Sequence, residues 1–170
     1  MKLFVLAGKA RSGKDSVGKI IKNYYHDKKV VIYSSTYYLK DYVKKITDWD
    51  GSDKDKPRSL LQSLGKTIKK DDPDIFIRRM REDIDLLKEY CDIIVVTGVR
   101  LVSELEFFRK YGSIIIKVES NRKNGLLLSQ SNDVTETDVD KFVDYDYVVH
   151  NDGDKDELSN NILTILKEVK

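Results

Sequence analysis

An eight-residue segment near the start of the sequence has the residue types and spacing of a loop that binds phosphate groups. It follows the pattern G-x-x-x-x-G-K, in which glycines let backbone N–H groups converge on phosphate oxygens and the lysine supplies a mobile ammonium group. The segment consists of Gly8, Lys9, Ala10, Arg11, Ser12, Gly13, Lys14 and Asp15. Lys14 is therefore expected to bind the β- and γ-phosphates of a nucleoside triphosphate.

Two oxygen-bearing side chains follow this lysine and are candidates for binding a metal ion. In the usual form of the loop a serine or threonine comes directly after the lysine and binds Mg²⁺, whereas here Asp15 comes first and Ser16 follows. Carboxylate and hydroxyl oxygens suit Mg²⁺, so Asp15 or Ser16 is expected to hold that ion. Alternatively, Asp15 only stabilises the first turn of the following helix, where a negative charge is favourable.

A strand before the loop and a helix after it are needed to position these residues. Residues 2–7 form a short apolar run that ends at Gly8, and residues 14–25 carry apolar side chains at helical spacing. This context of strand, loop and helix separates a phosphate-binding loop from a chance match. The alternative interpretation is a lysine-rich turn that joins the strand to the helix.

The rest of the sequence alternates between short β-branched runs and longer segments with helical periodicity. Four further strands are expected at residues 29–33, 92–97, 113–118 and 146–150. Helices are expected at residues 37–46, 57–68, 73–90, 101–111 and 157–169. The alternation predicts an α/β fold, a three-layer sandwich with a five-stranded parallel sheet, whose ligands bind beyond the carboxyl ends of the strands.

Composition and charge narrow the class of protein. The 170 residues fit a single domain, expected to span 1–170, and 31 Lys and Arg residues against 29 Asp and Glu residues give a formal net charge of +2. This balance does not indicate a nucleic-acid polymer or a membrane as a partner, so any positive site must be local. One cysteine and two histidines exclude an internal disulfide and a Cys/His zinc site. No apolar run has the length of a signal peptide or a membrane span, so a cytoplasmic protein is expected. The sequence does not indicate an oligomeric state.

Four segments resemble one group of kinases. The loop, with aspartate after the lysine, is similar to the G-x-x-x-S-G-K-D loop of phage-type deoxynucleoside monophosphate kinases and animal-type phosphomevalonate kinases. Residues 56–65 (KPRSLLQSLG) resemble the pRxLLQxLG segment of the deoxynucleotide kinase-like group, residues 95–104 its visDvRfpxE segment, and residues 144–153 its closing fDyvIxNdG segment. The resemblance implies a P-loop NTPase fold of the nucleoside monophosphate kinase-like type that uses ATP and Mg²⁺.

The same resemblance implies how the chain is divided and what it does. A helical insertion at about residues 36–90 would bind the acceptor, and a lid at about residues 120–137 would close over the reacting phosphates through Arg122. Asn151 and Gly153 would lie in the loop that packs against adenine, or would form only a turn and a helix cap. The implied reaction transfers the γ-phosphoryl group of ATP to a small-molecule nucleotide, a nucleoside monophosphate and in particular a deoxynucleoside monophosphate.

Three arginines and a glutamine are candidates for binding the acceptor. Arg58 and Gln62 lie four residues apart and share one face of a predicted helix, where they offer a guanidinium group for a phosphate and an amide for a base edge. A solvated helix face is the alternative for both, and also for Arg78 on the next predicted helix. Arg100 follows the third strand along the chain and is expected to contact phosphate, with an ion pair to Glu104 as the alternative.

Two positions depart from the pattern of the group. Gly98 stands where the group carries an aspartate that orients Mg²⁺ or its waters, and residues 133–136 (DVTE) stand where it often has His-Pro-x-Glu. The first departure predicts weak metal binding or low turnover unless Asp15 compensates. Two alternative functions follow. One is a kinase of another phosphorylated or pantetheine-bearing metabolite, such as phosphomevalonate or dephospho-coenzyme A, and the other is a nucleotide-binding module with little turnover.

Overall fold

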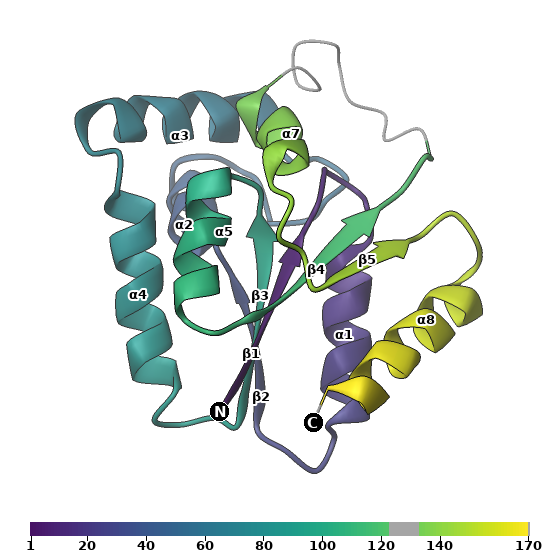
Figure 1. The fold of residues 1–170 in the computed structure, drawn as a ribbon. Helices are drawn as coiled ribbons and strands as arrows, with labels where there is room; N and C mark the ends of the chain where they lie inside the picture. The colour runs from purple at the N-terminus through teal and green to yellow at the C-terminus, as the bar shows by residue number, and fades with distance from the viewer. Residues whose placement is uncertain (123–132, 170) are drawn as a thin grey trace.

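The computed structural model describes residues 1–122 and 133–169, which fold around one five-stranded sheet (Figure 1). Neighbouring strands are all parallel, in the order β2-β3-β1-β4-β5. The strands are β1 (Lys2–Ala7), β2 (Val30–Ser34), β3 (Ile93–Val99), β4 (Ile114–Glu119) and β5 (Tyr147–His150). The expected five-stranded parallel sheet is confirmed, and the strand bounds differ from the expected ones by at most two residues.

Helices connect these strands. They are α1 (Lys14–Tyr24), α2 (Tyr37–Ile46), α3 (Arg58–Asp71), α4 (Ile75–Leu87), α5 (Val102–Lys110), α7 (Val134–Thr137), the 3₁₀ helix η1 (Asp138–Lys141) and α8 (Lys155–Glu168). The long helices lie where the sequence predicts them, whereas α7 and η1 are too short to show a helical period. None of the described helices is both long and apolar enough to cross a bilayer.

Apolar side chains of β1 alternate between the two faces of the sheet. Leu3 and Val5 belong to a core that includes side chains of α4 and α5, whereas Phe4 and Leu6 belong to a core that includes side chains of α1 and α8. This alternation follows the two-residue period of a strand. Figure 1 shows α1 and α8 on one side of the sheet and α4 and α5 on the other, which confirms the three-layer α/β sandwich.

A small separate core holds α3 against α2. Leu39 and Val43 of α2 pack with Trp49 and with Leu61 of α3, and Phe76 of α4 packs against the same cluster. These contacts fix the orientation of α3, so the side chains on its other faces have defined positions. The helices α2, α3 and α4 occupy the region expected to bind the acceptor, and that role stays a prediction.

The phosphate-binding loop emerges at the carboxyl edge of the sheet. Because β1 lies between β3 and β4, the loop that follows it starts near the middle of this edge. Gly8 has a φ of 142°, and a Cβ atom at this residue would lie 2.3 Å from the carbonyl oxygen of Val118 on β4. Glycine is therefore required where the loop passes β4.

Candidate active site

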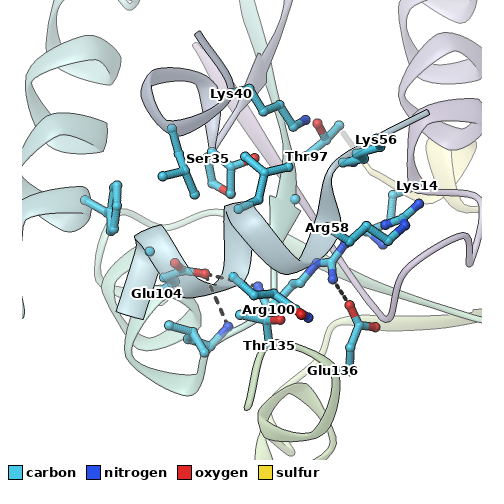
Figure 2. Close-up of a pocket in the computed structure, with 18 of the residues that line it drawn as sticks. Lys14, Ser35, Lys40, Lys56, Arg58, Thr97, Arg100, Glu104, Thr135 and Glu136 are labelled. Atoms are coloured by element: carbon cyan, nitrogen blue, oxygen red, sulfur yellow. Dashed lines mark hydrogen bonds and ion pairs between the residues drawn. The ribbon is translucent and has the colours of Figure 1, made fainter. Parts of the chain in front are cut away.

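A cavity of about 350 Å³ lies at the carboxyl edge of the sheet, next to the phosphate-binding loop (Figure 2). Its cationic lining side chains are Arg11, Lys14, Lys40, Lys56, Arg58, Lys66, Lys69 and Arg100. Its carboxylates are Asp15, Asp53, Glu104 and Glu136. Cations outnumber carboxylates two to one in a chain that is nearly neutral overall, so this cavity is suited to a ligand with several negative charges.

Lys14 lies at the base of this cavity, in the first turn of α1. Its side chain is buried, with 7% of the residue exposed, and Nζ lies 2.9 Å from the carbonyl oxygen of Gly8 and 2.5 Å from that of Lys9. Burial, followed by the nearby charge of Arg100, lowers the pKa of Lys14 to about 7, against the opposing effect of Asp15. A polyphosphate bound beside this ammonium group would stabilise its charged form.

A residue from the end of the sheet supports the loop. Asn151 follows β5, and its Nδ2 donates a hydrogen bond of 2.9 Å to the carbonyl oxygen of Ser12. Gly13 has a φ of 106°, and a Cβ atom there would lie 2.3 Å from Asn151 Nδ2. Asn151 therefore packs directly against the phosphate-binding loop, which fits its predicted place beside a bound nucleotide; contact with adenine stays a prediction, as it does for Gly153.

Asp15 and Ser16 present the oxygen atoms that a magnesium ion would need. Both side chains are exposed in the first turn of α1, and both line the cavity beside Lys14. Within the described ranges no three His, Cys, Asp or Glu side chains gather into a metal cluster. Mg²⁺ in kinases takes one or two protein oxygens, with phosphates and waters as its other ligands, so this pair fits the ion.

Gly98 has a backbone conformation that favours glycine. It lies in β3 with a φ of 85°, and a Cβ atom at this position would lie 3.1 Å from Ser35 Oγ and 3.7 Å from Ser34 Oγ. Ser35 is itself buried, and its hydroxyl has no hydrogen-bond partner within the described part of the chain. Hydroxyl groups thus lie next to the position where the resemblance predicted an aspartate.

Replacing Gly98 with alanine should destabilise the fold. An alanine with a φ near 85° is strained and must also displace Ser35, so the free energy of unfolding should fall by about 1–2 kcal/mol. Urea titration of Gly98→Ala and Gly65→Ala would measure this. Gly65 lies inside α3, where an added Cβ meets only Leu39 at an ordinary 3.6 Å, so Gly65→Ala should keep or increase stability. Equal stability of the two variants would contradict the assigned strain. Gly98→Asp adds the same Cβ atom as Gly98→Ala, so the effect of its carboxylate on activity must be measured relative to Gly98→Ala.

Arg100 follows β3 and directs its guanidinium group toward α7. The guanidinium pairs with Glu136, and 20% of the Arg100 side chain is exposed (Figure 2). Glu104, the alternative partner, instead accepts hydrogen bonds from the backbone N–H groups of Arg100 at 3.1 Å and Leu101 at 3.2 Å. Glu104 therefore caps the start of α5, while Arg100 stays at the wall of the cavity.

Arg58 and Gln62 both line the cavity from α3. Only 12% of the Arg58 side chain is exposed, and its Nη2 lies 3.8 Å from a carboxylate oxygen of Asp53. Burial lowers the pKa of Arg58, which is the effect of drawing a cation out of water. For Arg58 the solvated helix face is therefore ruled out.

Two predicted site residues lie elsewhere. Arg78 on α4 is exposed and pairs with Asp72, and it is not among the described side chains that line the cavity. Arg122 donates a hydrogen bond to the carbonyl oxygen of Gly153, also away from the cavity lining. Residues 123–132 of the predicted lid at about 120–137 lie outside the described residues, so closure by Arg122 stays a prediction.

Three further charged residues belong to the site, although their sequence context favours a surface position or carries no signal. Lys40 of α2 is half-buried, and its Nζ lies 3.2 Å from Ser34 Oγ; burial lowers its pKa. Lys56 lies before α3 and pairs with Asp53 at 3.2 Å. Glu136 of α7 is buried beside the loop. Lysines in amphipathic helices are exposed by default, and a glutamate in a four-residue helix carries no periodic signal, so only tertiary structure brings these three together.

Comparison with known proteins assigns the chain to a family. A model described as phosphomevalonate kinase matches residues 6–113, which is more than half of the chain. The chain belongs to the phosphomevalonate kinase family. The span shared with this family holds the phosphate-binding loop, Arg58 and Arg100, whereas Glu136 lies beyond it. No curated protein matches the chain.

Solved structures with a fold similar to this member of the phosphomevalonate kinase family include other small-molecule kinases. Shikimate kinase from Aquifex aeolicus is 17% identical with a TM-score of 0.52, covering 98% of this chain and 97% of that chain. Dephospho-CoA kinase from Campylobacter jejuni is 13% identical with a TM-score of 0.55, covering 99% and 98%. Shikimate kinase from Bacteroides thetaiotaomicron is 11% identical with a TM-score of 0.57, covering 99% and 98%. At these identities the likeness shows the fold, which is that of P-loop kinases.

The comparisons confirm part of the expected resemblance. They place this chain among P-loop kinases and in the phosphomevalonate kinase family, so a phosphotransferase is supported. The resemblance to deoxynucleoside monophosphate kinases stays a prediction.

Proposed function

We propose that this protein transfers the γ-phosphoryl group of ATP to the phosphate group of a small metabolite. The observation that carries the proposal is one cavity lined both by the phosphate-binding loop and by cations of α2, of α3 and of the residue that follows β3. Lys14, Arg58 and Arg100 all line this cavity, so it offers positive charge to two phosphate-bearing ligands. Charge neutralisation and positioning are the main contributions that an enzyme makes to phosphoryl transfer.

On the ATP side, the loop backbone and Lys14 would bind the β- and γ-phosphates. Asp15 and Ser16 would hold Mg²⁺, which when bound supplies positive charge beside the phosphates. Asn151 would support the loop from behind, through its hydrogen bond to Ser12.

On the acceptor side, Arg58 and Arg100 would bind the acceptor phosphate, and Lys40 and Lys56 add positive charge at the same cavity. A phosphate acceptor is already ionised near neutral pH, so the reaction needs no general base. The proposed transfer is direct and in line, without a covalent enzyme intermediate.

A nucleoside monophosphate is the acceptor we propose first. Gln62 offers an amide to a base edge, and Leu61 and Phe76 give the same cavity an apolar surface on which a base could pack. Phosphomevalonate is the second candidate, because the family model that matches the chain is that of phosphomevalonate kinase.

Transfer from radiolabelled ATP to a panel of acceptors tests the proposal. The panel would hold ribo- and deoxynucleoside monophosphates, phosphomevalonate and dephospho-coenzyme A, each with Mg²⁺. Transfer to a nucleoside monophosphate supports the first candidate, and transfer only to phosphomevalonate supports the second. Tight ATP binding without transfer to any of these acceptors would contradict the proposed function and favour a binding module.

Replacing Arg58 with methionine should weaken acceptor binding selectively. Losing a charge-assisted contact of about 1.5–3 kcal/mol should raise the acceptor KM roughly 10- to 100-fold, with the KM for ATP nearly unchanged. Lys70→Met is the matched control, because Lys70 is an exposed cation on the same helix. Steady-state kinetics with each substrate varied in turn would check this, and an equal rise in both KM values would argue against an acceptor-specific role.

A further inference from the structure

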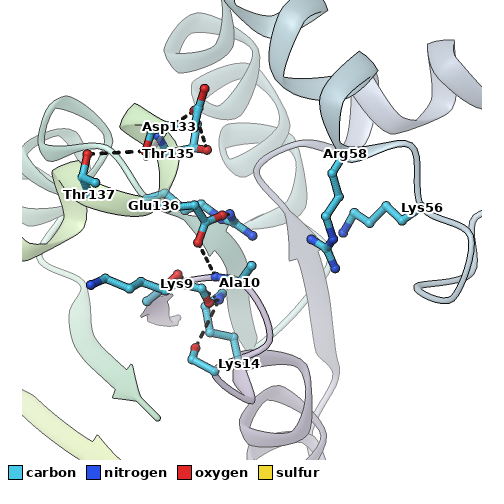
Figure 3. Close-up of polar contacts among 12 residues, drawn as sticks. Lys9, Ala10, Lys14, Lys56, Arg58, Asp133, Thr135, Glu136 and Thr137 are labelled. Atoms are coloured by element: carbon cyan, nitrogen blue, oxygen red, sulfur yellow. Dashed lines mark hydrogen bonds and ion pairs between the residues drawn. The ribbon is translucent and has the colours of Figure 1, made fainter. Parts of the chain in front are cut away.

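Four carboxylates in α7, in η1 and at the residue before α7 contact other parts of the chain around the carboxyl edge of the sheet. Figure 3 shows one of these contacts, between Glu136 and Ala10. The contacts are Asp133 with Lys66 Nζ of α3 at 2.6 Å, Glu136 with Ala10 N at 2.7 Å and with Arg100, Asp138 with Val102 N of α5 at 2.8 Å, and Asp140 with Lys9 Nζ at 2.6 Å. Each carboxylate therefore contacts a different partner around the carboxyl edge of the sheet.

Glu136 is the carboxylate that joins the phosphate-binding loop to Arg100. One oxygen accepts the hydrogen bond from the backbone N–H of Ala10, and the other pairs with the Arg100 guanidinium. Only 4% of Glu136 is exposed, so its charge is withdrawn from water and depends on these two partners. A buried carboxylate held at both oxygens has little freedom to move, and it limits the movement of both partners.

The contact with Glu136 holds the guanidinium group of Arg100 in place. Glu136 engages one terminal nitrogen of the guanidinium, which carries five N–H donors in a fixed plane. The group is thereby held at the cavity, and the fork geometry of arginine leaves other N–H donors that can bind a phosphate. Without Glu136, the long arginine side chain would be free to take other rotamers.

We propose that Glu136 is a positioning residue that fixes Arg100 relative to the phosphate-binding loop, so that the acceptor phosphate is aligned with the γ-phosphate of ATP. The proposal rests on the proposed function, because it assumes that both phosphates bind in this cavity. Glu136 itself touches neither substrate in this role and acts through Ala10 and Arg100.

Glu136→Gln tests the proposal, with Asp138→Asn as its matched control. Both variants change a carboxylate to an amide in the same segment, and both keep an oxygen that accepts from a backbone N–H, at Ala10 and Val102 respectively. Asp138 does not line the cavity within the described part of the chain. For Glu136→Gln we expect kcat to fall about 10- to 100-fold, with acceptor KM changed much less, because misplacement of a catalytic group acts on the transition state.

The split between turnover and binding gives a readout that a merely structural role would not move. A structural defect lowers the fraction of folded protein, so it reduces kcat and the calorimetric stoichiometry of ATP binding together. In Glu136→Gln, ATP binding should instead keep the wild-type stoichiometry while kcat falls, and in Asp138→Asn both should stay near the wild-type values. Glu136→Asp restores the charge but is too short to hold both partners, so it should keep a low kcat.

The outcomes separate this proposal from the proposed function. A wild-type protein that binds ATP but transfers to no acceptor refutes the proposed function, and with it the role in transfer. A wild-type protein that does transfer, together with a Glu136→Gln variant that matches Asp138→Asn in kcat, overturns the positioning role alone. Should Glu136→Gln fail to fold, Glu136→Asp decides: wild-type kcat in that variant would also overturn it.

Discussion

Replacing Lys14 with methionine should abolish phosphoryl transfer while leaving the fold intact. Methionine keeps the length and apolar body of the side chain but removes the ammonium group from the base of the cavity. The loss of one positioned cation at transferring phosphates should lower kcat roughly 100- to 1000-fold or more. Transfer assays at saturating ATP would measure this. Lys19→Met is the control, since Lys19 is an exposed lysine on the same helix.

The same variant should be more stable than the wild type near neutral pH. Burial lowers the pKa of Lys14 from 10.5 to about 7, so between these values the unfolded chain binds more protons than the folded chain. Wild-type stability should therefore rise as the pH rises through this window, and below it the folded state carries the full cost of a buried charge. Lys14→Met lacks that cost, so its advantage should be largest near pH 6 and shrink toward pH 10.

Urea unfolding of Lys14→Met, Lys19→Met and wild type at pH 6 and pH 9 would check this difference. A Lys14→Met variant that is less stable than wild type at pH 6 would show that the ammonium group is held by its carbonyl contacts rather than destabilised by burial. Retained turnover in the same variant would refute the mechanism proposed for the site.

Replacing Arg100 with methionine should have the second largest effect. The variant loses the guanidinium that is expected to bind the acceptor phosphate, so kcat should fall about 100-fold or more. It also leaves Glu136 buried with a single backbone partner, which should lower the free energy of unfolding by about 1–3 kcal/mol. Arg79→Met, at an exposed arginine paired with Glu82 on α4, should change neither property.

The pH dependence of Arg100→Met gives an independent check. Arg100 is the charge that most lowers the pKa of Lys14 after burial itself, so its removal should raise that pKa. The alkaline loss of ATP affinity should then move to higher pH. Calorimetric titrations across pH 6–9 would show this, and a shift to lower pH would contradict the electrostatic assignment.

Much of the fold follows from local patterns in the sequence. The apolar runs of β1 and β3 are buried on both faces, and such runs are typical of parallel strands covered by helices. The phosphate-binding loop combines glycines and a lysine in an order that has few other uses, so its place between a strand and a helix could be predicted. Arg100 could be proposed because it follows a predicted strand, and Arg58 because the resemblance placed it in the acceptor pocket.

The rest of the site depends on contacts between distant segments. Arg58 and Arg78 both lie on predicted helices, and only the packing of α3 and α4 turns Arg58 into the cavity and leaves Arg78 with Asp72 at the surface. Glu136 falls at the glutamate of the group's His-Pro-x-Glu pattern, but its contacts appear only when α7 meets the loop. The strain at Gly98 is equally hidden, because a residue type does not reveal its φ.

Because residues far along the chain support the phosphate-binding loop, the nucleotide site should form late during synthesis and folding. The loop is made from the first residues of the chain, but Glu136 meets Ala10 across 126 residues and Asn151 meets Ser12 across 139. Contacts of such long range form late, because the intervening chain must first be ordered. During synthesis, the loop would therefore be translated long before its supports exist. A nascent chain should acquire a competent nucleotide site only when its final third has been made and folded onto the edge of the sheet.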